Sequence, residues 1–98
     1  MEQGAGMLPS RLKAEARHII SRNVTANVAG ADIAFIEAPG HIHLSYFLFG
    51  TATGADEQER ELALCELIAC FPEIRTAVSA FGNAVEMPDE KDLIFSAS

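Results

Sequence analysis

The sequence predicts a small α+β domain with the element order helix–strand–strand–helix–strand–strand. The evidence is two kinds of apolar spacing. Residues 10–22 and 56–71 repeat apolar positions every three or four residues, as a helix with one buried stripe does. Residues 31–37 and 41–49 alternate apolar and polar positions, as a half-buried strand does. We therefore expect one mostly antiparallel sheet with both helices packed on one face.

The first helix is predicted between Ser10 and Arg22, directly after Pro9. Proline suits the first turn of a helix, because its missing N–H would have no partner there. The apolar stripe of this helix consists of Leu12, Ala16, Ile19 and Ile20. The residues before it, 1–8, are small and rich in glycine, so we expect them to be flexible.

A hairpin is predicted next. Residues 24–30 form either a short strand or an extended approach to strand 31–37, and Pro39-Gly40 then turns the chain into strand 41–49. A tight turn would place Phe35 opposite Leu44 and Ile33 opposite Tyr46. The core face of the hairpin would carry Ile33, Phe35, Ile42, Leu44, Tyr46 and Leu48. Its second face would carry Ile36, His41, His43, Ser45, Phe47 and Phe49.

The second helix follows the loop of residues 50–54 and ends before Pro72, with Thr53 or Asp56 as its N-terminal cap. We expect it to be the more buried helix, with Cys65 and Cys70 as small buried side chains. Its stripe toward the sheet is Leu64, Leu67, Ile68 and Phe71. The last two strands are predicted at 74–81 and 93–95, and residues 84–87 are a candidate hairpin extension of the third strand.

The net charge of −7 lies wholly in residues 51–98, where ten acidic residues stand against three basic ones. Residues 1–50 carry four of each sign. An acidic surface repels nucleic-acid phosphates and anionic lipids but attracts a basic protein. We therefore predict no nucleic-acid partner, no membrane partner and, as the favoured class, a basic protein partner.

We predict that the protein does not catalyse a reaction, because a catalytic set of nucleophile, base and orienting group cannot be assembled from these residues. His41 and His43 are weak metal candidates, since strand spacing puts them on one face about 6–7 Å apart. A metal site would need a third ligand, for which Glu37 and His18 are the candidates. The prediction is a protein without a cofactor that is not an enzyme.

The expected location is the cytoplasm. A run of about 18 apolar residues, as a spanning helix needs, is missing, and residues 1–11 lack the charged-then-apolar layout of a signal peptide. At 98 residues the chain is expected to form a single domain, 1–98.

The stretch IHLSYFLFG, followed by TGADEQERELALCELIACFPEI, resembles small acidic immunity proteins of bacterial contact-dependent inhibition and other polymorphic toxin systems. The resemblance implies a protein that binds and masks a cognate toxin, often a basic nuclease. It carries over no individual binding residue.

Two surfaces are left as binding candidates, and a small His-based metalloprotein is the weaker alternative. The first is the acidic surface, which would meet the basic partner through Asp56, Glu57, Glu59, Glu61, Glu66, Glu86, Asp89, Glu90 and Asp92. The second is the second face of the hairpin. It would form a homodimer through Ile36, Phe47 and Phe49, because the helices would leave these side chains exposed.

Overall fold

The computed structural model describes residues 2–36, 40–89 and 92–97. Its elements are α1 (Glu2–Arg22), β1 (Val28–Ile36), β2 (His41–Leu48), α2 (Gly54–Cys70), β3 (Thr76–Asn83), the short 3₁₀ helix η1 (Ala84–Glu86) and β4 (Phe95–Ser96). The predicted class and element order are confirmed. The helix α1 is longer than predicted, because it begins at Glu2 and includes Pro9 instead of starting after it. Residues 28–30 belong to β1, so the stretch 24–30 is in part a strand.

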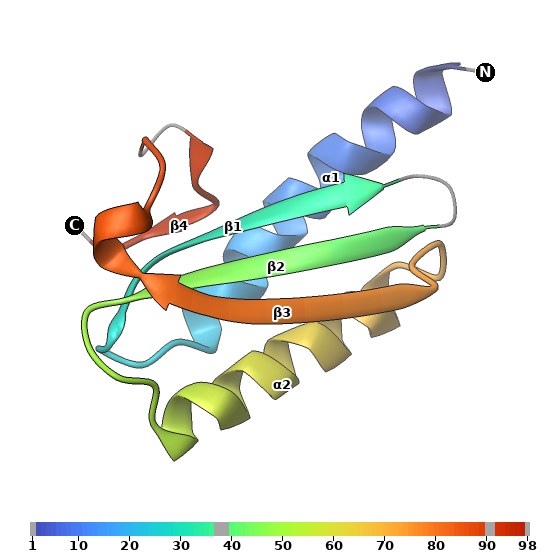
Figure 1. The fold of residues 1–98 in the computed structure, drawn as a ribbon. Coiled ribbons are helices and arrows are strands. Elements are labelled where there is room, and N and C mark those ends of the chain that lie inside the picture. The colour runs from blue at the N-terminus through green and yellow to red at the C-terminus, as the bar shows by residue number, and fades with distance from the viewer. Residues whose placement is uncertain (1, 37–39, 90–91, 98) are drawn as a thin grey trace.

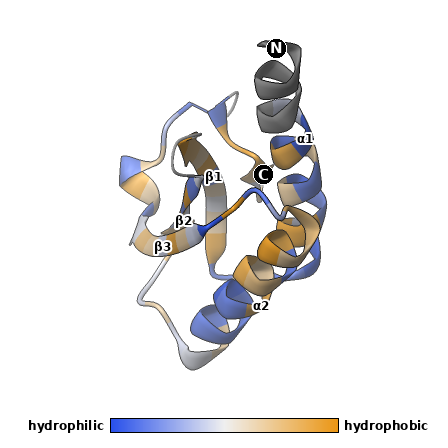
Figure 2. Ribbon diagram, turned by 90° about the vertical axis from the view of Figure 1, so that its right-hand side faces the viewer, coloured by the Kyte–Doolittle hydropathy of each residue, from blue (hydrophilic) through white to orange (hydrophobic). Residues whose placement is uncertain are grey.

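The four strands form one sheet in the order β3-β2-β1-β4. The strand β1 is antiparallel to β2 and to β4, whereas β3 is parallel to β2. The parallel pair is joined through α2, as a parallel pair requires a long crossover. Both helices cover the same face of the sheet (Figures 1 and 2).

The two C-terminal strands do not form the second hairpin that the sequence suggested. They lie at opposite edges of the sheet, and residues 84–86 form η1 instead of a strand extension. The strand β4 is short and pairs with β1 only through Gly30 and Ala31.

The predicted hairpin register is wrong by two residues. Ile33 lies opposite Leu44, and Phe35 lies opposite Ile42. The reason is the length of the turn: residues 37–40 separate the paired ends of the strands, whereas a tight turn would have used two residues. A shift of two residues leaves every side chain on its predicted face, so the predicted core face is correct.

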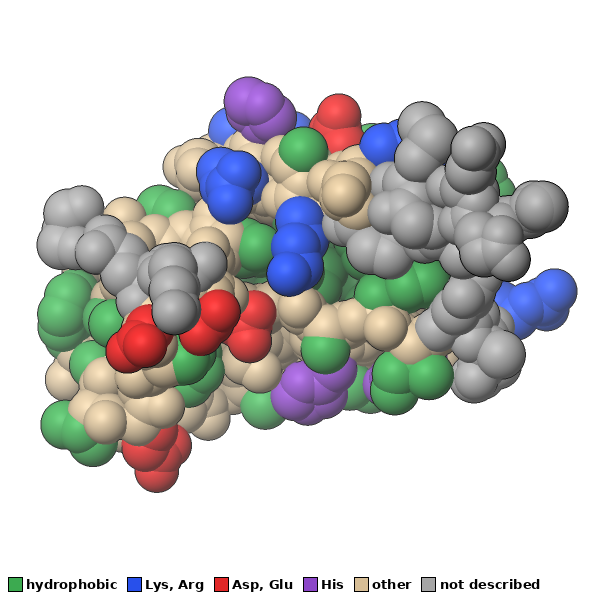
Figure 3. Space-filling view, turned by 90° about the horizontal axis from the view of Figure 1, so that it is seen from above, with side chains coloured by type: hydrophobic (Ala, Val, Ile, Leu, Met, Phe, Trp, Pro, Cys, Tyr) green, Lys and Arg blue, Asp and Glu red, His purple; other side chains and the backbone are tan. Residues whose placement is uncertain are grey.

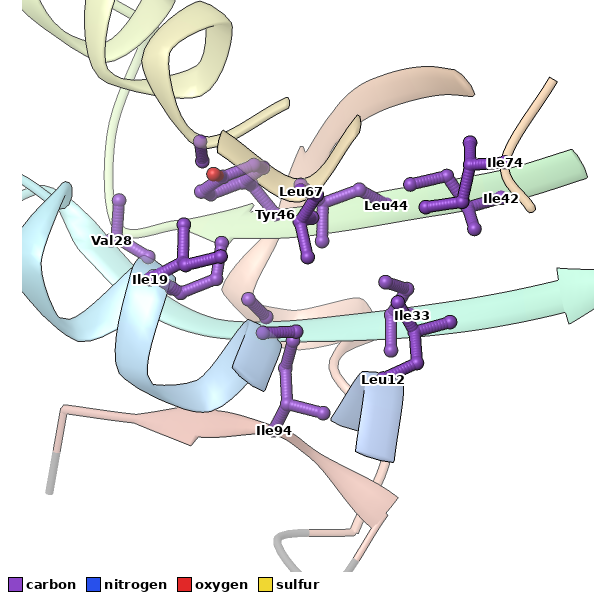
Figure 4. Packing of buried hydrophobic residues seen from close by; sticks show 14 of the residues in the cluster. Leu12, Ile19, Val28, Ile33, Ile42, Leu44, Tyr46, Leu67, Ile74 and Ile94 are labelled. Atoms are coloured by element: carbon purple, nitrogen blue, oxygen red, sulfur yellow. The ribbon is translucent and has the colours of Figure 1, made fainter. Parts of the chain in front are cut away.

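The core lies between the sheet and the two helices. The stripe of α1 predicted from the sequence is fully buried: Leu12, Ala16, Ile19 and Ile20. Figure 4 shows Leu67 of α2 beside Leu44 and Tyr46 of β2, while Leu12 and Ile19 of α1 point toward Ile33 and Val28 of β1. Tyr46 and Phe71 are the largest of the fully buried side chains.

The helix α2 is less buried than the sequence suggested. Within it, only Asp56, Ala63 and Leu67 are buried, and Ile68 is 45% exposed. Residues 67 and 68 differ in direction by about 100°, so a helix that points Leu67 into the core turns Ile68 toward its flank. Cys65 and Cys70 are both exposed, which corrects the expectation that they are small buried side chains.

Candidate protein-binding surfaces

The start of α2 is held by a buried carboxylate. Thr53 is the N-cap, and its side chain and that of Asp56 form a reciprocal capping box. Asp56 also accepts hydrogen bonds from the Asn27 side chain at 2.9 Å and from the Thr25 hydroxyl. Burial alone would raise the pKa of Asp56, but the hydrogen bonds from Thr25, Asn27 and Thr53 outweigh it and lower the pKa to about 2.

Asp56 is therefore a correction to the predicted partner-binding set. Its side chain is buried and its oxygens are occupied by the chain itself, so it fixes the loop before α2. Glu66 has a similar internal role. It accepts a hydrogen bond from Arg22 at 2.6 Å and one from Asn23 at 3.2 Å, and it thereby fastens α2 to the end of α1.

The exposed acidic residues gather at one end of the molecule. The Arg60 guanidinium lies 5.1 Å from the centre of the Phe81 ring, so the early turns of α2 lie beside the end of β3. The chain continues from β3 into η1 at that same end (Figure 1). Figure 3 shows acidic side chains collected there. We call this end of the molecule the acidic end and define it by two groups of exposed residues, Glu57 and Glu61 of α2, and Glu86, Asp89 and Asp92 of the segment that follows β3.

Two further members of the predicted acidic set stand apart. Glu59 is only partly exposed and lies close enough to the buried Tyr46 to act on its titration. Glu90 lies outside the described residues. The acidic end is thus smaller than the predicted set, but its members are drawn from two segments that are distant in the sequence.

The second candidate surface is the open face, by which we mean the sheet face opposite the helices. Its part nearest the β1–β2 turn carries His41 and His43 of β2, with Ile36 opposite His41 on β1 and Val78 opposite His43 on β3. Ile36 is 53% exposed and Val78 is 44% exposed. The His41 Nδ1 atom lies 2.7 Å from the Thr76 hydroxyl on β3.

The predicted dimer face does not form one continuous patch. Ile36 lies beside the turn, whereas Phe47 lies six residues further along β2 from the partner of Ile36, about 20 Å away. Phe47 is half-buried between Gly30 and Gly82, and a Cβ at Gly82 would lie 3.4 Å from its ring. Phe49 is 63% exposed, beyond the end of β2.

A metal site at His41 and His43 finds no support in the described part of the chain, which contains no group of three or more His, Cys, Asp or Glu side chains able to hold an ion. Of the two proposed third ligands, Glu37 lies outside the described residues. His18 is exposed on α1, in the helix layer, whereas His41 and His43 face the other side of the sheet.

Val78 and the strand that carries it were not among the predicted site residues. The strand was predicted, but its place at the edge of the sheet depends on the parallel pairing with β2. A signal was present in the sequence, because residues 76–83 (TAVSAFGN) contain no charged residue and no proline.

No protein-family model and no curated protein matches this chain. None of the helices that the structure describes is long and apolar enough to cross a membrane.

Proposed function

We propose that the chain is a non-enzymatic, cytoplasmic protein-binding domain of the immunity type, which binds and masks a basic toxin partner. The observation that carries this proposal is the acidic end. Its five carboxylates are exposed, whereas Asp56 and Glu66 are committed to internal contacts. Glu61 has an exposed ion pair with Arg60 at 3.6 Å, and among the described residues no ion pair is formed by Glu57, Glu86, Asp89 or Asp92. Most of the charge of the acidic end is therefore not used by the fold itself.

A surface of this kind acts mainly on the encounter between two proteins. Opposite charges on the two partners raise the association rate, and salt screens the attraction beyond about 8 Å at physiological ionic strength. The proposed complex should therefore form faster and bind more tightly at low salt. A nuclease toxin needs a basic surface to hold nucleic acid, so an acidic inhibitor would cover the surface on which the toxin depends.

The experiment measures binding to the basic protein encoded beside the gene of this chain, by calorimetry at low and at physiological salt. The variant Glu86→Lys/Asp89→Lys changes the acidic end, and Glu15→Lys/Glu73→Lys makes the same change in net charge elsewhere on the exposed surface. We expect the first to weaken binding about tenfold or more and the second to have little effect. Equal losses in both variants, or no binding at low salt, would refute the proposal.

A second candidate function is assembly through the open face. The observation that favours it is the exposure of Ile36 and Val78 on a sheet face that the helices leave uncovered. Sedimentation velocity would test it with Ile36→Glu, which places a charge on the exposed apolar part of such an interface. A protein that is monomeric throughout, or a dimer that Ile36→Glu leaves intact, would exclude this function.

A further inference from the structure

The strand β3 has a free edge. It pairs with β2 on one side, and among the described residues no strand pairs with its other side. The amide of Thr76 donates to the Gly40 carbonyl at the start of β2, so the even-numbered residues of β3 direct their backbone groups toward β2. In a parallel ladder the backbone groups of successive residues point to opposite sides of the strand, so the odd-numbered residues of β3 direct their N–H and C=O groups away from β2. The amides and carbonyls of Ala77, Ser79 and Phe81 therefore line the free edge.

The strand β3 itself lacks the sequence features that usually prevent strands from pairing between molecules, although Arg60 of α2 lies over Phe81 near its end. Natural edge strands are commonly short, or carry lysine, proline or a bulge. The strand β3 is eight residues long and has no charged residue and no proline. The opposite side of the sheet is different, since the Asp32 carboxylate accepts the amide of Ile33 at 2.8 Å on the stretch of β1 that β4 leaves unpaired.

One side of α2 lies beside this edge. The helix α2 packs against β3, whereas α1 packs against β1 and β4. Glu66 of α2 faces α1, because it accepts a hydrogen bond from Arg22. The opposite side of α2 carries the spacing i, i+4, i+7, i+11 that defines one helical stripe. Its members are Glu57, Glu61, Leu64 and Ile68. The two apolar members of the stripe remain partly or largely exposed beside the edge of β3.

We propose that β3 pairs antiparallel with β3 of a second copy of this chain, with the two Val78 residues opposite each other on the two-fold axis. Val78 directs its backbone groups toward β2, so the two Val78 residues would form a pair without mutual hydrogen bonds, the closer kind of antiparallel pair. Ala77 of each copy then exchanges hydrogen bonds with Ser79 of the other.

Charge complementarity supports a second copy as the occupant. Arg75 is exposed at the start of β3, and within the described residues it takes part in no ion pair. Glu57 and Glu61 lie beside the end of β3, where Arg60 covers Phe81. Antiparallel pairing brings the start of one β3 to the end of the other, so Arg75 of each copy comes to the Glu57, Arg60 and Glu61 side chains of its mate. Glu61 is already 3.6 Å from Arg60, so this cluster carries one net negative charge opposite Arg75. Two acidic molecules thus meet across a neutral strand with opposite net charges at either end.

The helix layer fits the same arrangement. The helix α2 packs against β3, so pairing of the two β3 strands brings the two α2 helices together on the same side of the joined sheet. The helices run antiparallel across the axis, and Leu64 of each copy comes close to Ile68 of the other. This contact would bury the Ile68 side chain, which the single chain leaves 45% exposed. The inference needs no basic toxin and so goes beyond the proposed function.

A disulfide experiment tests the register. In a protein with Cys65→Ser and Cys70→Ser, we introduce Val78→Cys and, as the matched control, Thr76→Cys. The two Val78 positions have a Cα separation of about 4.5 Å in this pairing, at the short limit of disulfide geometry. The two Thr76 positions would lie about 13 Å apart along the strands. Mild oxidation should link nearly all of the Val78→Cys protein into covalent dimers and little of the control. Equal linkage of both, or linkage of neither, overturns the proposal.

Sedimentation equilibrium of the full chain tests the dimer without cross-linking. We expect a dimer, a tenfold or larger rise in its Kd for Val78→Lys, and no change for Ile36→Lys on the open face. Arg75→Glu should raise the Kd, and adding Glu61→Arg to it should restore the affinity. A monomer at about 100 μM, or a dimer broken by Ile36→Lys and not by Val78→Lys, overturns the proposal. Circular dichroism confirms that each variant is folded, and none of these results depends on the basic partner.

Discussion

The side chain of Asn27 donates a hydrogen bond of 2.9 Å to the carboxylate of Asp56, across 29 residues of sequence. Asn27 also accepts a hydrogen bond from the amide of Gly50 at 2.9 Å. The connection between α1 and β1, the end of β2 and the start of α2 are therefore tied at one point. Such a junction holds the loop that leads into the acidic end, and its carboxylate should matter for stability.

We predict that Asp56→Asn lowers the free energy of unfolding by roughly 2–3 kcal/mol at pH 7. Asn is of nearly the same size but offers the amides of this site a weaker, uncharged acceptor. Urea denaturation followed by circular dichroism measures the change. Asp89→Asn, an exposed carboxylate of the acidic end, is the control and should change the stability by less than about 0.5 kcal/mol.

The same carboxylate predicts a pH dependence. The pKa of Asp56 falls from an ordinary 3.8 to about 2 in the folded chain, so the folded state favours the ionised form. Its contribution is complete above about pH 4 and is lost as the pH falls toward 2. The difference in stability between the native protein and Asp56→Asn should therefore shrink below pH 4. A difference that stays constant down to pH 2 would contradict this account.

Removal of the Tyr46 hydroxyl should cost little. The ring is buried against Phe81, with the ring centres 5.9 Å apart, and burial raises the pKa of its phenol. Within the described residues the hydroxyl has no hydrogen-bond partner. We expect Tyr46→Phe to leave the free energy of unfolding within about 1 kcal/mol of the original or to raise it. A loss above about 2 kcal/mol would mean that the hydroxyl is hydrogen-bonded in solution.

Gly40 should not tolerate a side chain. Its φ is +96°, in the region that favours glycine, and a Cβ would overlap the carbonyl oxygen of Glu73. We predict that Gly40→Ala destabilises the fold by at least about 1–3 kcal/mol in thermal or urea unfolding. Gly54→Ala is the matched control, because Gly54 begins α2 and a Cβ there meets nothing within 4 Å. The control should be neutral or slightly stabilising.

Two neighbouring residues of α2 should respond very differently to truncation. Leu67 is fully buried, so Leu67→Ala should cost roughly 2–5 kcal/mol by loss of burial and formation of a cavity. Ile68→Ala should change the stability of the monomer by less than about 1 kcal/mol. Urea unfolding at low protein concentration separates the two. Similar losses in both variants would show that Ile68 packs in the interior.

Both cysteines should be accessible to a thiol reagent in the folded protein. Cys65 and Cys70 are exposed on α2, contrary to the expectation from their apolar surroundings in the sequence. We expect Ellman's reagent to titrate both thiols without denaturant, at rates near those of the unfolded chain. Protection of Cys70 alone would indicate that the surface near Phe71 is covered.

The parts of the fold that depend on local spacing could be predicted from the sequence. The alternation from Ile42 to Leu48 fixes which side chains face the core whatever the register, and the stripe of α1 fixes its buried side. The hairpin register could not be predicted, because it depends on the length of the turn. The place of β3 depends on pairing with a strand more than thirty residues earlier, for which the chain carries no local signal.

In the candidate site, too, local spacing predicted some features and could not predict those that depend on distant residues. The sequence indicated Asp56 both as a helix cap and as a partner-binding residue, and spacing alone could not separate the two roles. The outcome depends on Thr25 and Asn27, which belong to the connection before β1 and are separated from Asp56 in the sequence by β1 and β2. Glu57 and Glu61 share the same run of sequence but are exposed, and the contact of Glu61 with Arg60 is a surface ion pair, so both carboxylates remain accessible to another molecule.

The unequal edges of the sheet set a limit on how far an assembly of this chain can grow. When two copies pair, the free edges of both β3 strands become hydrogen-bonded to each other. In the part of the chain that the structure describes, the other edge consists of the two-residue strand β4 and a stretch of β1 whose Ile33 amide is already occupied by Asp32. After two copies have paired through β3, the described residues offer a third copy no comparable edge to which it could add. The pairing that we propose therefore gives a closed dimer and not a fibre.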